Sequence, residues 1–527
     1  MRIPAGRWHW LSSPWWRGLV AVAVGALPAL AFPAPSLWWF AYVALVPWML
    51  LIRSAPTGRR AALDGWLGAT GFMIAVHHWL MPSLHVFIVV LAGLLALLWL
   101  PWGWLVRWTL GGAPSVRRAT AALAVVPSGW LMAELVRSWE GLGGPWGLLG
   151  SSQWQVAPAL RLVSVGGVWL VSLLVVAVNT GVVVLLTAPA ARRPVVAALV
   201  ACAVAVGAVS AWAPRPEQTG RVRVAVVQPG VVSGPERRFA LSEALTRDLA
   251  GRDPDLVVWG ESSVGADLTE RPDLAARLAA LSRLVGAEVL VNVDARRSDR
   301  PGIFKSSVLV GPEGVTGGRY DKMRLVPFGE YVPARSLLGW ATAVGKAAGE
   351  DRRRGTSPVV MTLPGGGVGG LRVGPLVCFE SAFPDMSREL TRRGAQVLVT
   401  QSATSTFQHS WAPEQHASLA ALRAAENGRP VVHATLTGVS AVFGPRGERA
   451  GSPLGTDASA SVVYDVPLAE GSTVYVRAGD WPVHGALAVL VLLGAAGAVR
   501  ALRRRAAPPP PGPPARTARA SAARPGR

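Results

Sequence analysis

Long apolar runs constrain this chain more than any other feature of its sequence. A helix needs about 20 mostly apolar residues to cross a bilayer, and eight runs approach this length. We predict spans at 15–32, 36–52, 64–81, 84–106, 119–137, 162–187, 194–213 and 483–501. Charged residues make up 16% of the chain, against about 25% in soluble proteins. The composition therefore also indicates a membrane protein.

Basic residues are unevenly distributed among the loops that join these spans. Every second flank is rich in arginine, whereas the alternate loops hold almost none. The rich flanks contain Arg2, Arg7 and Arg17; Arg53, Arg59 and Arg60; Arg107, Arg117 and Arg118; Arg192 and Arg193; and Arg500, Arg503, Arg504 and Arg505. Because basic loops stay in the cytoplasm, we expect both termini there and the segment after the seventh span outside. Cleavage of the first run near Ala31, as a signal peptide, would not change this placement.

These patterns divide the chain into four parts. We predict a transmembrane domain with seven spans at 1–213, an extracytoplasmic domain at 214–480 and a last span at 481–502. The tail at 503–527 is rich in Pro, Ala and Arg, so we expect it to be disordered and to bind the anionic inner leaflet. The net charge of +21 does not indicate nucleic-acid binding, because many arginines flank apolar runs or lie in this tail.

The segment 214–480 alternates short β-rich runs with helical stretches. Predicted strands cover 222–228, 256–259, 289–293, 307–310, 371–378, 397–400, 431–434 and 441–443, and predicted helices cover 268–285 and 416–426. Branched side chains bounded by Gly or Pro favour buried strands. We therefore expect an α/β domain with two sheets and helices on their outer faces.

Three polar residues follow or interrupt these strands. Glu261 comes two residues after a strand, Lys322 lies in a loop, and Cys378 ends a strand. Taken singly, Glu261 is more simply a solvated carboxylate, Lys322 a solvated amine and Cys378 a buried, inert thiol. The chain holds two cysteines, and Cys202 lies in an apolar run, so neither a disulfide framework nor a zinc site is expected. We expect no metal and no cofactor.

Taken together, the motifs around these residues resemble the Glu–Lys–Cys arrangement of the nitrilase superfamily. They are Trp259-Gly260-Glu261-Ser262, Tyr320-Asp321-Lys322, Pro327-Phe328-Gly329-Glu330 and Cys378-Phe379-Glu380. With the flanking spans, the chain up to about residue 505 resembles an apolipoprotein N-acyltransferase. Two further segments, 423–430 and 477–482, also resemble that family's patterns. The resemblance implies a nitrilase-like α-β-β-α sandwich beside a polytopic α-helical domain in a bacterial inner membrane.

The resemblance also implies a two-step reaction. Cys378 attacks a phospholipid ester to form a thioester, and the α-amine of an S-diacylglyceryl cysteine on an apolipoprotein then takes the acyl chain. Glu261 would act as general base, and Lys322 would favour the thiolate and stabilise the oxyanion. Glu330 would orient Lys322, and Glu380 would support the turn at the nucleophile.

The sequence departs from the family's pattern near the lipid site. Phe379 stands where Tyr is common, and Gly260 stands where Pro is common. Residues 401–405 read Gln-Ser-Ala-Thr-Ser, where the family usually carries an Asn-Asp-Ala-Trp-Phe-like run. Because Phe407 and Trp411 follow closely, we assign lipid contacts to Phe379, Phe407 and Trp411.

Two other functions remain open at this point. A membrane-tethered amidase or nitrilase would hydrolyse small amides, and a non-catalytic relative would only bind lipoproteins. The loop at 138–161 is either an irregular segment that lines a lipid path or a plain turn. The glycine run at 365–370 precedes a strand, so it does not indicate a dinucleotide site. We interpret His77, His78 and His85 as packing or interfacial residues.

Overall fold

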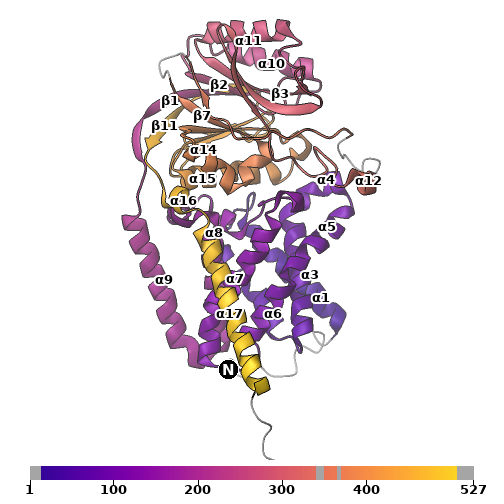
Figure 1. Ribbon diagram of the computed structural model, residues 1–527, viewed down its shortest axis with the longest axis vertical. Coiled ribbons are helices and arrows are strands. Elements are labelled where there is room, and N and C mark those ends of the chain that lie inside the picture. The colour runs from indigo at the N-terminus through magenta and orange to yellow at the C-terminus, as the bar shows by residue number, and fades with distance from the viewer. Residues whose placement is uncertain (1–12, 340–348, 365–369, 507–527) are drawn as a thin grey trace, which may run out of the picture.

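The computed structural model describes residues 13–339, 349–364 and 370–506, and it stacks a two-sheet part on a bundle of helices (Figure 1). Arg2, Arg7, the glycines at 365–369 and the tail at 507–527 lie outside the described residues. Expectations about them, including the binding of the tail to the inner leaflet, stay predictions.

Among the residues that the structure describes, the helical part contains nine α-helices. This number includes α17 and leaves out the single turn α4 (Met81–Leu84). They are α1 (Pro14–Ala26), α2 (Val46–Arg53), α3 (Gly58–His77), α5 (Phe87–Ala96), α6 (Leu100–Leu110), α7 (Val116–Arg137), α8 (Ala157–Thr187), α9 (Arg192–Trp212) and α17 (Trp481–Ala506). Six helical segments in this part of the chain are long and apolar enough to cross a membrane: Pro14–Ala31, Phe87–Leu110, Val116–Arg137, Ala157–Thr187, Pro189–Trp212 and Trp481–Arg503. The predicted spans at 36–52 and 64–81 are helical only in pieces or in part, so the number of eight spans stays a prediction.

Glycines let several of these helices approach closely. A Cβ at Gly25 of α1 would lie 2.0 Å from the carbonyl oxygen of Gly68 in α3, and one at Gly65 of α3 would lie 2.8 Å from the Cα of Gly103 in α6. Small residues at such crossings bring backbones into contact, which is a main source of helix association in a bilayer. The pairs therefore fix how α1, α3 and α6 cross.

The upper part contains two sheets that pack face to face. The first has the order β11-β1-β2-β3-β4-β5 and the second has the order β10-β9-β8-β7-β6. Their bounds are β1 (Glu217–Gln228), β2 (Leu256–Trp259), β3 (Glu288–Arg296), β4 (Ile303–Gly311), β5 (Gly314–Asp321), β6 (Met361–Thr362), β7 (Arg372–Val377), β8 (Val397–Ser402), β9 (Val431–Thr435), β10 (Ala441–Phe443) and β11 (Ala460–Glu470). Alternate valines of the two sheets, such as Val224 and Val399, share one buried core, as expected for a sandwich.

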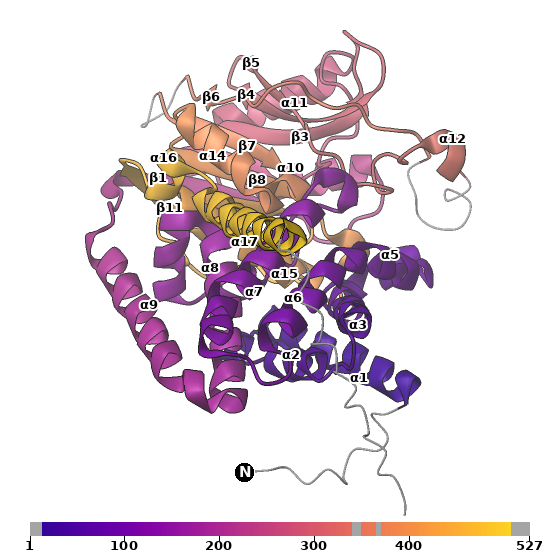
Figure 2. The same ribbon diagram turned by 60° about the horizontal axis from the view of Figure 1, so that its bottom comes forward.

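Helices cover both outer faces of this sandwich. The first sheet carries α10 (Pro235–Arg247) and α11 (Pro272–Val285), whose apolar faces pack on it. The second carries α14 (Pro384–Arg392) and α15 (Ala412–Asn427), which lie between this sheet and the helical part (Figures 1 and 2). The predicted α-β-β-α arrangement beside a helical membrane part is confirmed.

The eight predicted strands all occur, but three further strands were missed. β5 holds three glycines, and β11 contains Pro467 and lies at the edge of its sheet. Glycine and proline are rare in strands, so neither segment was predicted as one. The edge of a sheet nevertheless tolerates proline. The prediction that Cys378 ends a strand is wrong by one residue, because β7 ends at Val377 and Cys378 starts the 3-10 turn η9 (Cys378–Ala382).

Buried side chains of α15 join the two parts. Gln415 accepts hydrogen bonds from the indole nitrogens of Trp79 (3.1 Å) and Trp146 (2.8 Å) and donates one to the carbonyl oxygen of Pro33 (3.1 Å). The loop that holds Trp146 forms two 3-10 turns, η6 (Glu140–Leu142) and η7 (Leu149–Gln153), and much of it is buried. The segment 138–161 is therefore irregular and largely buried, and its role in lining a lipid path stays a prediction.

A kink in α8 forms the second junction. Gly166 and Gly167 leave the helical conformation there, which frees the amide of Val168 to donate to Glu426 of α15 (2.9 Å). Nearby, Trp169 donates to Asp480 (3.1 Å). The segments 423–430 and 477–482, singled out from the sequence, thus supply side chains to this junction.

Candidate active site

Four charged side chains meet within the two-sheet part, one from β4 and three from the loops that follow β2 and β5. Lys305 of β4 contacts Glu261 (2.7 Å) and Glu330 (2.9 Å), and Lys322 contacts the same two carboxylates at 3.3 Å and 2.8 Å. Glu261 and Glu330 are buried, and their charges balance those of the two lysines. We call these four residues the charged quartet. The structure therefore brings the predicted Glu261, Lys322 and Glu330 together and adds Lys305.

The quartet keeps both carboxylates ionised. Burial by itself would raise the pKa of Glu261, but the positive charges of Lys305 and Lys322 outweigh burial and hold that pKa below its usual value. The same balance lowers the pKa of Glu330, which also accepts a hydrogen bond from the amide of Val326 (2.8 Å). Opposite charges at such distances favour the charged forms. Glu261 is thus a carboxylate near neutral pH and can accept a proton.

Cys378 sits on a strained turn directly after β7. Its φ of 50° is uncommon for a residue with a side chain, and such conformations cluster at functional sites. Glu380 fixes this turn, because its carboxylate accepts hydrogen bonds from the amides of Val377 (2.8 Å), Met323 (2.7 Å) and Arg324 (3.0 Å) and from the Tyr320 hydroxyl (2.7 Å). Glu380 thereby ties the loop that holds Lys322 to the turn that holds Cys378.

The Cys378 thiol is protonated at rest. Burial raises its pKa, the negative charge of Glu261 raises it further, and Lys322 and Lys305 oppose them only in part, so that the pKa lies at about 12. The thiol lies on the turn that Glu380 ties to the loop after Lys322. A neutral thiol beside an ionised carboxylate is the starting state for general-base activation of a nucleophile.

The backbone of Cys378 is held by Ser381 of the same turn and by His416 of α15. Its carbonyl oxygen accepts a hydrogen bond from Ser381 (2.9 Å) and lies 3.1 Å from Nε2 of His416 on α15. Burial lowers the pKa of His416 to about 4, so the ring is neutral at pH 7. Because the contact is to a carbonyl oxygen, Nε2 carries the proton and donates.

Gly260 explains how Glu261 reaches this position. A Cβ on Gly260 would lie 2.3 Å from the backbone nitrogen of Leu436, so the strand end fits against the loop after β9 only without a side chain. The next amide, that of Glu261, donates to the carbonyl oxygen of Ser402 (3.1 Å). The glycine noted in the sequence is therefore required by this close approach.

The three residues assigned to lipid contact lie where the upper part meets the helical part. The Phe379 ring packs edge-on against Phe383 (4.9 Å between centroids), and both rings lie 2.7 Å from a Cβ built on Gly144. Phe407 packs on Trp79 (4.8 Å) and Trp411 on His78 (4.5 Å). Aromatic side chains therefore lie at the boundary with the apolar helices, and one of them, Phe379, directly follows Cys378 in the chain.

The divergent segment 401–405 has a structural role of its own. Gln401 is buried between the two sheets, where its amide donates to the carbonyl oxygens of Trp259 (2.8 Å) and Leu290 (3.2 Å) and accepts from Ser307 (2.6 Å). It therefore joins the sheets close to the strand end that leads to Glu261.

The histidines and metal-binding residue types form no further site. Nδ1 of His77 lies 3.0 Å from the carbonyl oxygen of Met73, and Nδ1 of His78 lies 2.9 Å from that of Ala75. Both rings thus contact backbone carbonyl oxygens of α3, the helix that holds His77 and ends directly before His78. Such contacts are typical of histidines that pack against their own helix. In the part of the chain that the structure describes, no group of three or more His, Cys, Asp or Glu residues is arranged to hold a metal ion.

Sequence reasoning missed Lys305 and the contact of His416. Lys305 lies inside a strand of otherwise small and apolar residues, directly opposite Asp294 of β3, and a lysine at such a position is itself unusual. Its register with Asp294 and its proximity to Glu261 follow only from sheet pairing. His416 begins the helix predicted at 416–426, and this helix places its ring 3.1 Å from the Cys378 carbonyl oxygen.

Comparisons with known proteins cover nearly the whole chain. Residues 24–181 match the model of the apolipoprotein N-acyltransferase N-terminal domain, and residues 223–474 match that of the carbon-nitrogen hydrolase family. The apolipoprotein N-acyltransferase of Geobacter metallireducens is 30% identical over 504 residues, which is 90% of this chain and 94% of that protein. That of Azotobacter vinelandii is 33% identical over 519 residues, or 92% and 96%. Among solved structures, an amidase from Nesterenkonia sp. is 20% identical, with a TM-score of 0.34, and covers 48% of this chain and 92% of its own.

Proposed function

Because this chain belongs to the apolipoprotein N-acyltransferase family, we propose that it transfers a fatty acyl chain from a phospholipid to the α-amine of an S-diacylglyceryl cysteine on an apolipoprotein. The observation that carries this proposal is a neutral Cys378 thiol on a strained turn beside the ionised Glu261. This nucleophile lies at the boundary with the apolar helices. A lipid ester in a bilayer can reach a nucleophile at this boundary, whereas a soluble substrate does not require a nucleophile next to membrane helices.

In the first step, Cys378 attacks the ester carbonyl of the phospholipid. Glu261 takes the thiol proton as the sulfur forms its bond to the carbonyl carbon, and the ammonium of Lys322 stabilises the oxyanion. The tetrahedral intermediate then expels the lysophospholipid alkoxide, which receives the proton from Glu261. The product is a thioester on Cys378, with Glu261 again ionised.

In the second step, the lipoprotein amine attacks the thioester. Glu261 accepts a proton from the attacking nitrogen, Lys322 again stabilises the oxyanion, and the Cys378 sulfur leaves. The sulfur recovers its proton from Glu261, and an N-acylated lipoprotein is released. Splitting the transfer lets two bulky lipid substrates use one site in turn.

Four residues act as positioning residues in this proposal. Glu330 and Lys305 hold Lys322 and Glu261 in their charged forms, Glu380 holds the turn at the nucleophile, and His416 holds the Cys378 carbonyl oxygen. The support for these roles is the hydrogen bonds and ion pairs described above. Phe379, Phe407 and Trp411 would contact acyl chains.

We further propose that the upper part, at 214–480, lies outside the bacterial inner membrane and that both termini lie in the cytoplasm. In this arrangement the seven spans at 1–213 and the span at 481–502 flank the catalytic domain. The support is the alternation of arginine-rich flanks along the chain. Both lipid substrates would then reach the site from the outer leaflet.

The experiment that tests the proposed function is intact-mass spectrometry of the purified protein after incubation with phospholipid and no acceptor. We expect a mass gain of one acyl chain that hydroxylamine removes and that Cys378→Ala lacks. Addition of a diacylglyceryl lipopeptide should then discharge the adduct and acylate the peptide. A protein that releases carboxylic acid from small amides and never forms the lipid adduct would instead be a hydrolase, and one that does neither would be a binding protein.

A further inference from the structure

A cavity of about 1140 Å³ lies between the helical part and the upper part. Its lining comes from loops and helix ends of both parts. It includes four arginines, Arg161, Arg215, Arg446 and Arg449, together with Trp154. No residue of the charged quartet or of the Cys378 turn lines it, and the reaction proposed above makes no use of it.

Helix α15 separates this cavity from the catalytic residues. Glu414 and Ala425 of α15 line the cavity, and they share one face of the helix because they are eleven residues, or about three turns, apart. His416 lies on the opposite face, where it contacts the Cys378 carbonyl oxygen (3.1 Å). The cavity is therefore a distinct site and does not extend the catalytic one.

The arginines of this cavity are not neutralised by carboxylates. Arg161 donates to the carbonyl oxygens of Ser210 (3.1 Å) and Pro214 (3.2 Å), and Arg215 donates to that of Ser210 (2.9 Å). Arg449 lies over the Trp154 ring (5.3 Å to its centroid). Among the described residues, none of the four arginines has a salt bridge to a carboxylate.

The lining as a whole carries a net positive charge. It holds two acidic residues, Glu414 and Glu448, against the four arginines, and Glu448 accepts its hydrogen bond from the backbone amide of Arg446 (2.9 Å). Arg161 and Arg215 both donate to the carbonyl oxygen of Ser210, so their guanidinium groups lie close together. Like charges held together in this way attract an anion.

The cavity lies at the depth of lipid headgroups. It borders the first turns of α8 and the end of α9, and almost all of α9 is exposed and apolar, as for a helix that faces lipid. Trp212, the last residue of α9, is 83% exposed, and amphipathic indoles of this kind mark the membrane interface. An anion that enters the cavity from the bilayer is therefore a phospholipid phosphate.

From this geometry we propose that the cavity is a second phospholipid site, which binds the phosphate of an anionic headgroup away from Cys378. Guanidinium groups recognise phosphate oxygens with paired N–H donors, and Trp154 supplies an apolar wall for the glycerol backbone. Residues of both parts line the cavity, so a bound lipid links α8 and α9 to the turn after β10. The proposal does not rest on the acyl-transfer reaction.

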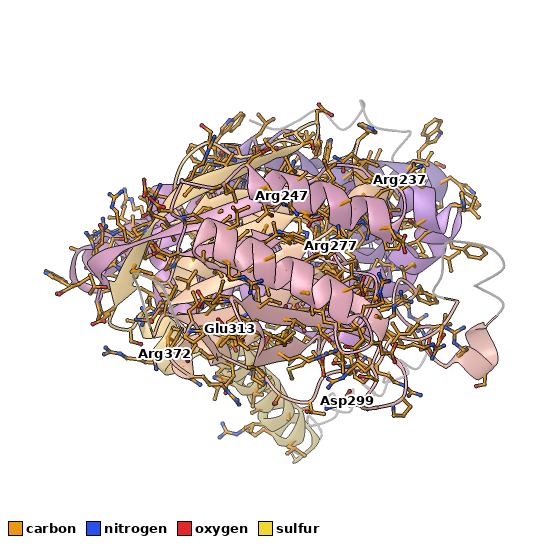
Figure 3. The ribbon with its side chains drawn as sticks, turned by 90° about the horizontal axis from the view of Figure 1, so that it is seen from above. Arg237, Arg247, Arg277, Asp299, Glu313 and Arg372 are labelled. Atoms are coloured by element: carbon orange, nitrogen blue, oxygen red, sulfur yellow. The ribbon has the colours of Figure 1, made fainter. Side chains whose placement is uncertain are left out.

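The test is native mass spectrometry of the delipidated full chain titrated with a dialkyl-ether phosphatidylglycerol, which cannot donate an acyl chain. The test variant is Arg446→Gln/Arg449→Gln, whose side chains are exposed at the cavity rim. The matched control is Arg237→Gln/Arg247→Gln, two arginines of α10 on the face remote from the helical part (Figure 3). Both variants lose the same charge, and a thermal melt checks that both are folded.

At roughly fivefold in affinity per interfacial arginine, the test variant should bind one lipid about 25-fold more weakly, and the control should match the wild type. Lipid counts and affinities that are equal in all three proteins would overturn the proposal. Inorganic phosphate that competes as well as the ether lipid would show that the site takes the free anion, which would overturn its assignment to lipid.

Discussion

Replacement of Lys305 by glutamine should shift the acid limb of the reaction to higher pH. The charged quartet is neutral as a whole, so Lys305→Gln leaves two buried carboxylates beside one ammonium. Two carboxylates that share one site cannot both stay ionised at low cost. Glu330 retains its contacts with Lys322 (2.8 Å) and with the Val326 amide (2.8 Å), whereas Glu261 retains only Lys322 at 3.3 Å. Glu261 is therefore the group that takes up the proton.

The size of the shift follows from the contact that is lost. A hydrogen bond to a charged group contributes about 1.5 to 3 kcal/mol, and one pKa unit corresponds to about 1.4 kcal/mol. The 2.7 Å contact between Lys305 and Glu261 is largely shielded from solvent, so its loss raises the pKa of Glu261, and we expect the midpoint of the acid limb to move up by about 1 to 2 pH units. A protonated Glu261 cannot accept the thiol proton, so thioester formation slows in acid and recovers as the pH rises.

The assay is single-turnover formation of the acyl adduct on Cys378, followed by intact mass between pH 4 and pH 9. Lys305→Arg is the matched control, because it keeps the charge and should keep the wild-type profile. Thermal melts of both variants separate a change in proton affinity from a loss of fold. A Lys305→Gln profile that superimposes on the wild type while the protein stays folded would refute the electrostatic coupling.

Four further predictions follow from other contacts of the site. Because the pKa of Cys378 is raised to about 12, its alkylation by iodoacetamide should rise about tenfold per pH unit from pH 7 to pH 9, and a plateau near pH 8.5 would contradict this. Gly260→Ala should abolish adduct formation in a folded protein, because its Cβ would displace the backbone at Leu436; retained activity in a single-turnover assay would exclude that close approach. Glu380→Gln leaves fewer acceptors for the backbone amides around the nucleophile, so adduct formation should slow by at least about tenfold, which corresponds to about 1.4 kcal/mol. Gln415→Leu leaves two buried indole N–H groups without an acceptor, which should lower stability by about 2 to 5 kcal/mol in a denaturant titration, and an unchanged midpoint would show that water replaces the amide.

Local sequence patterns were sufficient for the elements that carry the nucleophile and the base. Apolar runs identified the main helices, and branched residues with punctuating glycines located eight strands. The motifs around Glu261, Lys322 and Cys378 gave their order along the chain and their place at strand ends. These features are readable because the period and composition of a segment depend on residues close together in the sequence.

Two features of the fold depend on tertiary contacts more than on local sequence preference. β11, which contains Pro467, is a strand because β1 offers it an antiparallel partner along its full length. The segments at 36–52 and 64–81 contain 3-10 turns, and Gln415 of α15 donates to the carbonyl oxygens of Pro33 and Val76 close to these turns. Neither partner can be inferred from the segment itself.

The sequence by itself therefore determined the two-part architecture, the family and the three residues for which we propose catalytic roles, since each depends on local composition or on a motif of a few positions. Only the tertiary structure decided that Lys305 joins the quartet, that His416 supports Cys378, and that four arginines gather beneath α15. Sheet register and helix packing bring these side chains together from strands and helices far apart in the chain. The charge interactions within the quartet and among the arginines exist only after folding. In the unfolded chain these groups lie far apart, and water and salt screen their charges.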